Sequence, residues 1–176
     1  MSGCDPGPAV VVAVRGWLGT PYVHQAAARG AGADCLGLVR GVWAELYGPL
    51  PEALPPYTPD WAEPAREEAL WAAALRHLRP GGAVPAPGEV LLFRMRAGAV
   101  AKHLGVLTEV PGPGLAGARF VHAYSGHGVV ESALSAPWAR RVVARFAFPP
   151  PGECGATAGS GRPLLVAAHE GRQPPH

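Results

Sequence analysis

The chain has 176 residues, of which 48% are hydrophobic and 16% are charged, and its formal net charge is +2. This composition argues against wholesale disorder and predicts one domain with its own core, while 24 glycines and 21 prolines indicate many loops. The charge is too small to indicate nucleic acid as a partner, and no apolar run approaches the roughly 20 residues of a membrane span. We also expect no signal peptide, because Asp5, Pro6 and Pro8 interrupt the N-terminus, and we therefore expect synthesis in the cytoplasm.

The first predicted element is an apolar run over residues 8–17. Its periodicity fits either a strand or a helix, and its β-branched valines favour a strand on propensity alone. A loop with several glycines follows and leads into a second apolar pattern, which has helical spacing and stops at Gly48-Pro49. The apolar face of this predicted helix consists of Leu38, Val39, Val42, Trp43 and Leu46.

Cys35 lies in the first turn of this predicted helix, and Asp34 directly precedes it in the position of an N-cap. Unpaired N–H groups and the positive end of the helix dipole favour an anion there. We therefore expect the Cys35 thiol to ionise more easily than that of a free cysteine. The alternative is a small apolar residue in a tight helix packing, because free cysteine is among the most buried residue types.

A further helix is predicted over residues 63–78, where apolar residues recur at helical spacing before Pro80-Gly81-Gly82. Beyond residue 88 the pattern changes to short strands separated by turns. The predicted strands cover residues 89–94, 103–109, 119–124, 128–132 and 141–148. Helices followed by strands predict an α+β domain with an antiparallel sheet.

The C-terminal part of the chain has the composition of a linker, rich in proline, glycine and serine. We therefore expect a domain over residues 1–148 and an extension over residues 149–176. The short apolar stretch 164–168 of this extension is expected to dock on the domain or on a partner protein. Cys4 and Cys154 lie in the Pro/Gly-rich ends, and a disulfide between them stays open as an alternative to two free thiols.

Histidines on two predicted strands are the candidates for acid–base chemistry. A cysteine attacks an amide well only beside a group that holds the thiol proton and later protonates the leaving amine, and histidine titrates in the right range. His103 opens one strand, and alternation places His122 of the next strand on the face opposite Val121. Neighbouring strands would bring the two imidazoles together. A zinc site built from His103, His122 and His127 is the main alternative, with Glu131 as its one nearby carboxylate.

Three motifs occur in a fixed order: G-T-P-Y at residues 19–22, D-C-L-G-L-V at residues 34–39 and K-H-L-G-V-L at residues 102–107. Together they resemble the NlpC/P60 cysteine peptidases, papain-like enzymes that cut cell-wall peptides. Two longer runs, P-Y-V-H-Q-A and V-R-G-V-W-A-E-L-Y-G, look most like the branch found in phage tails and gene transfer agents. The resemblance covers residues 8–148. It implies N-terminal helices, the first within residues 8–17, packed on a five- to six-stranded antiparallel sheet.

The resemblance also implies a role for each matching side chain. Cys35 matches the nucleophile, His103 the general base and acid, and His122 the residue that orients this base. Tyr22 matches a tyrosine beside the nucleophile. We expect the oxyanion formed during attack to meet the Cys35 N–H and a group from the Tyr22 loop.

Two residues near the predicted nucleophile have a structural interpretation as well. Asp34 is expected to cap the helix and to take no part in the chemistry. His24 either lines the substrate groove or braces the loop, and the sequence does not decide between the two. No metal and no cofactor are expected at this site.

The function implied by the resemblance is hydrolysis of amide bonds in peptidoglycan stem peptides. The phage branch implies an enzyme carried in a tail tip or baseplate, with hub proteins as partners, which opens the cell wall during DNA delivery. Two alternatives from other classes remain: a structural module of tail assembly with little activity, and an amidase or acyl transferase that uses the same Cys–His geometry.

Overall fold

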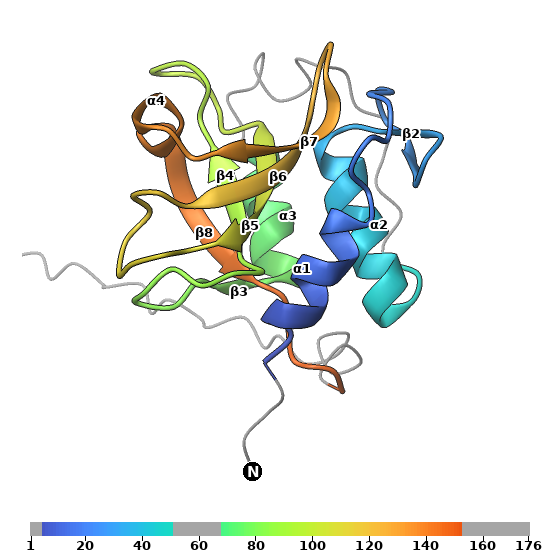
Figure 1. Cartoon of the computed structure of the whole chain (residues 1–176), viewed down its shortest axis with the longest axis horizontal. Coiled ribbons are helices and arrows are strands. Elements are labelled where there is room, and N and C mark those ends of the chain that lie inside the picture. The colour runs from blue at the N-terminus through green and yellow to red at the C-terminus, as the bar shows by residue number, and fades with distance from the viewer. Residues whose placement is uncertain (1–4, 51–67, 153–176) are drawn as a thin grey trace, which may run out of the picture.

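The computed structural model describes residues 5–50 and 68–152 (Figure 1). Its helices are α1 (Gly7–Arg15), α2 (Cys35–Tyr47), α3 (Ala69–His77) and α4 (Ala136–Ala139). Its strands are β1 (Ala27–Ala28), β2 (Gly32–Ala33), β3 (Arg79–Pro80), β4 (Val90–Phe93), β5 (His103–Glu109), β6 (Arg119–Tyr124), β7 (Gly128–Ala133) and β8 (Val142–Ala147). Helices before a sheet give the α+β class that the sequence predicts.

The apolar run near the N-terminus forms helix α1, so the helix implied by the resemblance is confirmed and the strand favoured by valine propensity alone does not form. Val10 and Val14 are fully buried, and their spacing of four residues places both on one helical face. Val12, on the opposite side, is 76% exposed. Burial of one face therefore outweighs the weak strand preference of valine, as tertiary packing commonly does.

Helix α2 has the predicted apolar face and ends at Gly48, as expected. It lies close to its neighbours because two of its positions are glycines. A Cβ at Gly37 would overlap the carbonyl oxygen of Ala26, and a Cβ at Gly41 would overlap the ring of Trp17. These glycines let the loop before α2 and the end of α1 pack directly on the helix backbone.

The main sheet has six antiparallel strands in the order β3-β8-β4-β5-β6-β7. The predicted bounds of β5 and β6 match the structure, and those of β4, β7 and β8 match within two residues at each end. The sequence did not predict the small β1–β2 ladder, strand β3 or helix α4. These elements have four residues or fewer, which is too short for a periodic pattern.

Each face of the sheet carries its own core. Figure 1 shows α1 and α2 on one side of the sheet and α4 on the other. The core under the helices includes Leu104, Val106, Val121 and Ala123, and the core under α4 includes Phe93, Leu107, Phe120 and Leu134. Alternation along β5 and β6 therefore sends odd and even positions to different layers, as predicted for β6.

Some predictions concern residues that the structure leaves undescribed. The first residues of the predicted helix over 63–78 lie outside the described ranges, and α3 accounts for most of the remainder. The apolar stretch 164–168, Cys4 and Cys154 also lie outside them. Within residues 5–50 and 68–152, no helix is long and apolar enough to cross a membrane.

Candidate active site

Asp34 fixes the N-terminus of α2 and the loop in front of it. Its Oδ1 accepts a hydrogen bond from the Gly37 N–H at 2.7 Å, so the predicted cap is confirmed. Its Oδ2 accepts another from the Gln25 N–H, also at 2.7 Å. Gln25 has a φ of 63°, a left-handed conformation that non-glycine residues adopt at a cost, and the bond to Asp34 offsets part of it. Cys35 is thereby held rigidly as the first residue of the helix.

The Cys35 sulfur lies against the beginning of strand β5. Sγ is 3.9 Å from the carbonyl oxygen of Lys102, and the backbone N–H of Leu104 also hydrogen-bonds to it. The sulfur thus contacts the main chain on both sides of His103. The Cys35 side chain as a whole is half-buried.

The expectation that Cys35 ionises easily is wrong for the free protein. Burial raises the pKa of the Cys35 thiol to about 12, and the Asp34 carboxylate adds to this increase. The N–H groups of Leu104, Leu36 and Cys35 act in the opposite direction and lower the pKa. The N–H groups at the helix terminus therefore lower the pKa, as predicted, but the removal of the sulfur from water raises it by more. Cys35 is therefore a neutral thiol at neutral pH.

His103 and His122 form a hydrogen-bonded pair of imidazoles. Their atoms Nε2 of His103 and Nδ1 of His122 are 2.9 Å apart, and the rings meet edge to face. Both side chains are buried, with exposed fractions of 8% and 2%. His103 makes this contact through Nε2, and its second ring nitrogen, Nδ1, takes no part in it. The sequence expectation that the strands bring the two imidazoles together agrees with this geometry.

Both imidazoles are neutral at physiological pH. Burial and, to a smaller extent, the neighbouring His122 lower the pKa of His103 to about 3. Burial also lowers the pKa of His122 to about 4, with a smaller effect from His127. A neutral His122 can accept a hydrogen bond at Nδ1, which a charged imidazolium cannot do.

The imidazole pair lies where the pairing between β5 and β6 ends. The paired positions of these strands run from Val106–Val121 to Glu109–Arg119, so His103 and His122 lie beyond the last pair. Their rings contact the aromatic layer under α4, whereas α2 packs on the opposite layer. The N-terminus of α2 reaches the sheet at this opening, which is how Cys35 meets the edge of β5.

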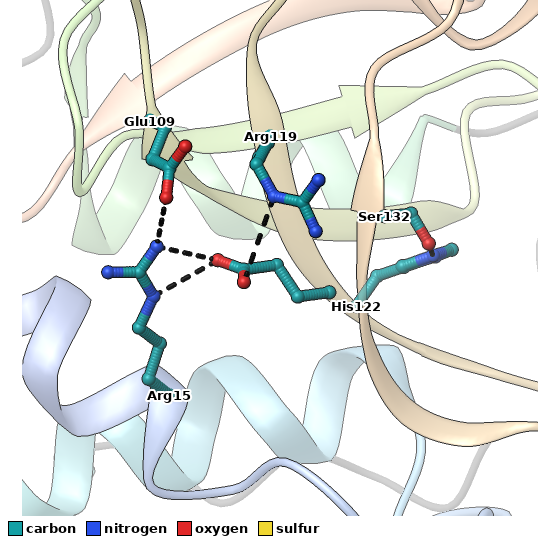
Figure 2. A network of polar contacts seen from close by, with 6 residues as sticks. Arg15, Glu109, Arg119, His122 and Ser132 are labelled. Atoms are coloured by element: carbon teal, nitrogen blue, oxygen red, sulfur yellow. Dashed lines mark hydrogen bonds and ion pairs between the residues drawn. The ribbon is translucent and has the colours of Figure 1, made fainter.

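Two residues of this site were missed by sequence reasoning. Nε2 of His122 lies 3.1 Å from Oγ of Ser132 on β7. Figure 2 shows the two side chains next to each other. The ring of Trp138 on α4 covers both imidazoles, at centroid distances of 5.7 Å to His103 and 5.1 Å to His122. Pairing of the two strands through the turn at residues 125–127 would have indicated Ser132. No pattern in the sequence indicates Trp138, because its helix has only four residues.

Tyr22 and His24 lie in the segment that precedes Cys35. Tyr22 is half-buried and forms a bridge with Ala33. Its pKa is raised by burial and, to a smaller extent, by the nearby Cys35 and Asp34, which places it within electrostatic range of the sulfur. Nδ1 of His24 is 3.5 Å from Oδ2 of Asp34, and this contact favours the interpretation in which His24 braces the loop.

Glu131 and His127 of the alternative zinc site have other partners than the pair of His103 and His122. Glu131 lies on the layer of the helices and binds Arg15 at 2.9 Å, and this arginine also binds Glu109 at 2.7 Å (Figure 2). His127 is exposed in the turn after β6 and stacks on Tyr124. Within the described part of the chain, no three or more His, Cys, Asp or Glu side chains are grouped as metal ligands.

Comparisons with known proteins identify the fold. No protein-family model matches the chain, and no curated protein sequence matches it either. Among solved structures, the NlpC/p60 domain of the peptidoglycan hydrolase SagA has a TM-score of 0.51 at 19% identity, over 81% of this chain and 98% of that domain. An NLP/P60 family protein from Staphylococcus aureus, described as similar to lipoprotein, has a TM-score of 0.51 at 18% identity and covers 84% of this chain.

An NlpC/P60 family protein from Bacillus cereus is also similar, with a TM-score of 0.55 at 14% identity over 85% of this chain. The chain spans 44% of the staphylococcal protein and 42% of the Bacillus protein. At these identities the likeness establishes the fold. The chain therefore has the α+β fold of NlpC/P60 domains.

Proposed function

We propose that this protein is a cysteine peptidase that hydrolyses amide bonds in peptidoglycan stem peptides. The observation that carries the proposal is the buried imidazole pair of His103 and His122 at the edge of β5 where the Cys35 sulfur lies. Acyl transfer requires a nucleophile beside an oriented base, and we assign these roles to Cys35 and to His103, the residue between the two main-chain groups that the sulfur contacts. The substrate class is supported by the likeness to a domain of a peptidoglycan hydrolase.

In the proposed first step, attack and proton transfer occur together because both groups are neutral at rest. The Cys35 sulfur forms a bond to the carbonyl carbon while its proton passes to Nδ1 of His103, and the carbonyl electron pair moves to oxygen. The Nε2–H of His103 donates to Nδ1 of His122 throughout, which stabilises the imidazolium that forms. The N–H groups of Cys35 and Leu36, which act on the sulfur, also favour the new oxyanion.

In the second step the imidazolium gives its proton to the amine nitrogen as the C–N bond breaks, and a thioester on Cys35 remains. Its buried position makes the His103 imidazolium a strong acid, which suits protonation of a poor leaving group. Water then attacks the thioester carbonyl while His103 takes a proton from it. Collapse of this intermediate releases the acid product and returns the proton to the thiol. The role that we propose for Tyr22 is contact with the substrate, and its support is the effect of Cys35 on the pKa of the tyrosine.

The setting that we propose is a phage-like tail. The runs P-Y-V-H-Q-A and V-R-G-V-W-A-E-L-Y-G resemble the tail and gene-transfer-agent branch of NlpC/P60 peptidases, and this resemblance is the support for the proposal. The protein would be made in the bacterial cytoplasm, be assembled with hub proteins of a tail tip or baseplate, and act on the wall from the particle. Cross-linking and mass spectrometry of purified particles should place it next to hub proteins; its absence from the particles would contradict this setting.

Digestion of purified sacculi tests the proposed activity. Wild-type protein should release muropeptides with new amino termini inside the stem, and mass analysis of these products would name the bond. The Cys35→Ala variant should release none while keeping the wild-type circular dichroism spectrum. Intact sacculi after prolonged digestion by the wild-type protein would contradict the peptidase and favour a structural module of the tail. Release of acyl groups from lipids or small amides, with sacculi uncut, would favour the acyl transferase or amidase.

A further inference from the structure

We propose that Ser132 is a positioning residue of this site: its hydroxyl oxygen holds His122 with Nδ1 facing His103 and with the proton on Nε2. The observation is the chain of three polar groups formed by His103, His122 and Ser132, with contacts of 2.9 and 3.1 Å. The inference deepens the proposed function and rests on it for its kinetic test. Its structural test is independent of activity.

Ser132 reaches His122 because of the register of two neighbouring strands. In the β6–β7 ladder Ser132 pairs with Phe120, and His122 pairs with Val130. Ser132 is therefore diagonal to His122 on the same face of the sheet, within reach of the far side of the imidazole. Its hydroxyl lies at Nε2, the ring nitrogen that His103 does not contact.

The surroundings of His122 give this hydroxyl its importance. The imidazole is 2% exposed, and its other neighbours include the rings of Phe120, Tyr124 and Trp138 at 4.4, 5.6 and 5.1 Å. The faces of these aromatic rings carry no strong hydrogen-bonding groups, so each nitrogen of the His122 ring depends on one polar partner. Without Ser132, Nε2 would be buried against aromatic carbon. The orientation of the ring would then be held by the contact with His103 alone instead of by two polar contacts, and a half-turn about its Cβ–Cγ axis, which removes Nδ1 from His103, would cost less than in the wild-type protein.

The positions of the protons on His103, His122 and Ser132 define what Ser132 must do. His103 can accept the thiol proton at Nδ1 only if its own proton is on Nε2. That N–H donates to Nδ1 of His122, which places the proton of His122 on Nε2, and this N–H donates to the Ser132 oxygen. The reverse order, with the hydroxyl donating to Nε2 of His122, would end with a proton on Nδ1 of His103 and would block the base. Ser132 therefore supports catalysis as an acceptor.

Three variants test the inference. Ser132→Ala removes the hydroxyl, Ser132→Thr retains it, and Ser135→Ala makes the same chemical change at an exposed serine whose side chain caps no helix. With a stem peptide as substrate, Ser132→Ala should lower kcat about tenfold with little change in KM, as expected for loss of one orienting hydrogen bond. Ser132→Thr and Ser135→Ala should keep kcat near the wild-type value.

The nitrogen chemical shifts of His122 provide the readout that does not depend on turnover. In histidine-labelled protein that also carries Cys35→Ala, Nε2 should appear protonated and Nδ1 unprotonated. Ser132→Ala in the same background should give averaged shifts of both tautomers, and Ser132→Thr should restore the first pattern. A proton on Nδ1 of His122 in the parent protein would overturn the inference, as would unchanged shifts together with unchanged kcat in Ser132→Ala. If wild-type protein cuts no stem peptide, the proposed function fails and the shifts alone decide the role of Ser132.

Discussion

The reactivity of Cys35 toward an alkylating reagent should depend on pH in a way that few catalytic cysteines show. Burial raises its pKa from an ordinary value of 9.0 to about 12. The thiolate, which is the form that reacts with iodoacetamide, is then about a thousandfold scarcer at pH 7 than in an unperturbed cysteine. We therefore expect alkylation of Cys35 at neutral pH to be slower than that of a free thiol by roughly this factor.

Peptide mapping after timed alkylation measures this rate for Cys35 separately from the other two cysteines. Between pH 7 and pH 10 the rate should rise about tenfold for each pH unit, because the pKa lies above this range. Glutathione measured in parallel serves as the free-thiol control, and its rate should level off near pH 9 to 10. The Cys35 rate should still be rising there. The same protein in urea should regain the behaviour of the free thiol, because unfolding returns the sulfur to water.

A fast rate that is constant from pH 5 to pH 8 would refute this reasoning. It would mean that Cys35 and His103 already exist as a thiolate–imidazolium pair in the free protein. The attack would then start from an ion pair, and the coupled proton transfer proposed above would be wrong. The assignment of the two residues as nucleophile and base would survive that result.

Three further predictions concern stability. His103 and His122 have pKa values lowered to about 3 and 4, so between those values and about pH 6.5 the unfolded chain binds more protons than the folded protein. Acidification from pH 8 to pH 5 should therefore lower the free energy of unfolding, measured with urea, by about 2 kcal/mol per imidazole. A variant with both His103→Asn and His122→Asn should show a weaker pH dependence. Equal pH dependence in both proteins would contradict the buried neutral pair. Asp34→Ala should lower the free energy of unfolding by about 3 kcal/mol, because it removes the cap of α2 and leaves the Gln25 N–H without its acceptor, whereas Asp34→Asn should cost less. Gly37→Ala should lower the Tm although alanine is the better helix former, because its methyl group would overlap the preceding loop; a raised Tm would show that the loop yields easily.

Much of the fold could be predicted because local and tertiary preferences agree there. The side chains of β5 and β6 alternate between the two layers, and α2 has a capping residue at each end, so the sequence predicts the bounds of these elements correctly. Helix α1 shows the opposite case, in which valine propensity indicates a strand and the packing of Val10 and Val14 decides for a helix. That packing is a property of the assembled domain.

The protonation states of the candidate site residues were harder to predict from the sequence than the residue types that occur there. The helix terminus around Cys35 is visible in the sequence, but the burial that raises the pKa of its thiol is a property of the folded domain. The same holds for Ser132 and Trp138, which meet the imidazoles only once β7 and α4 are in place. Local sequence thus indicates which groups are present, while the fold determines their protonation.

Capture of the covalent intermediate tests the central assignment most directly. Wild-type protein is mixed with a stem tetrapeptide, quenched in acid within milliseconds to seconds, and analysed by peptide mapping. The peptide that contains Cys35 should gain the mass of the acyl fragment as a thioester, and Cys35→Ala should show neither this adduct nor product. Continued hydrolysis by Cys35→Ala, or an adduct on a different residue, would contradict the account.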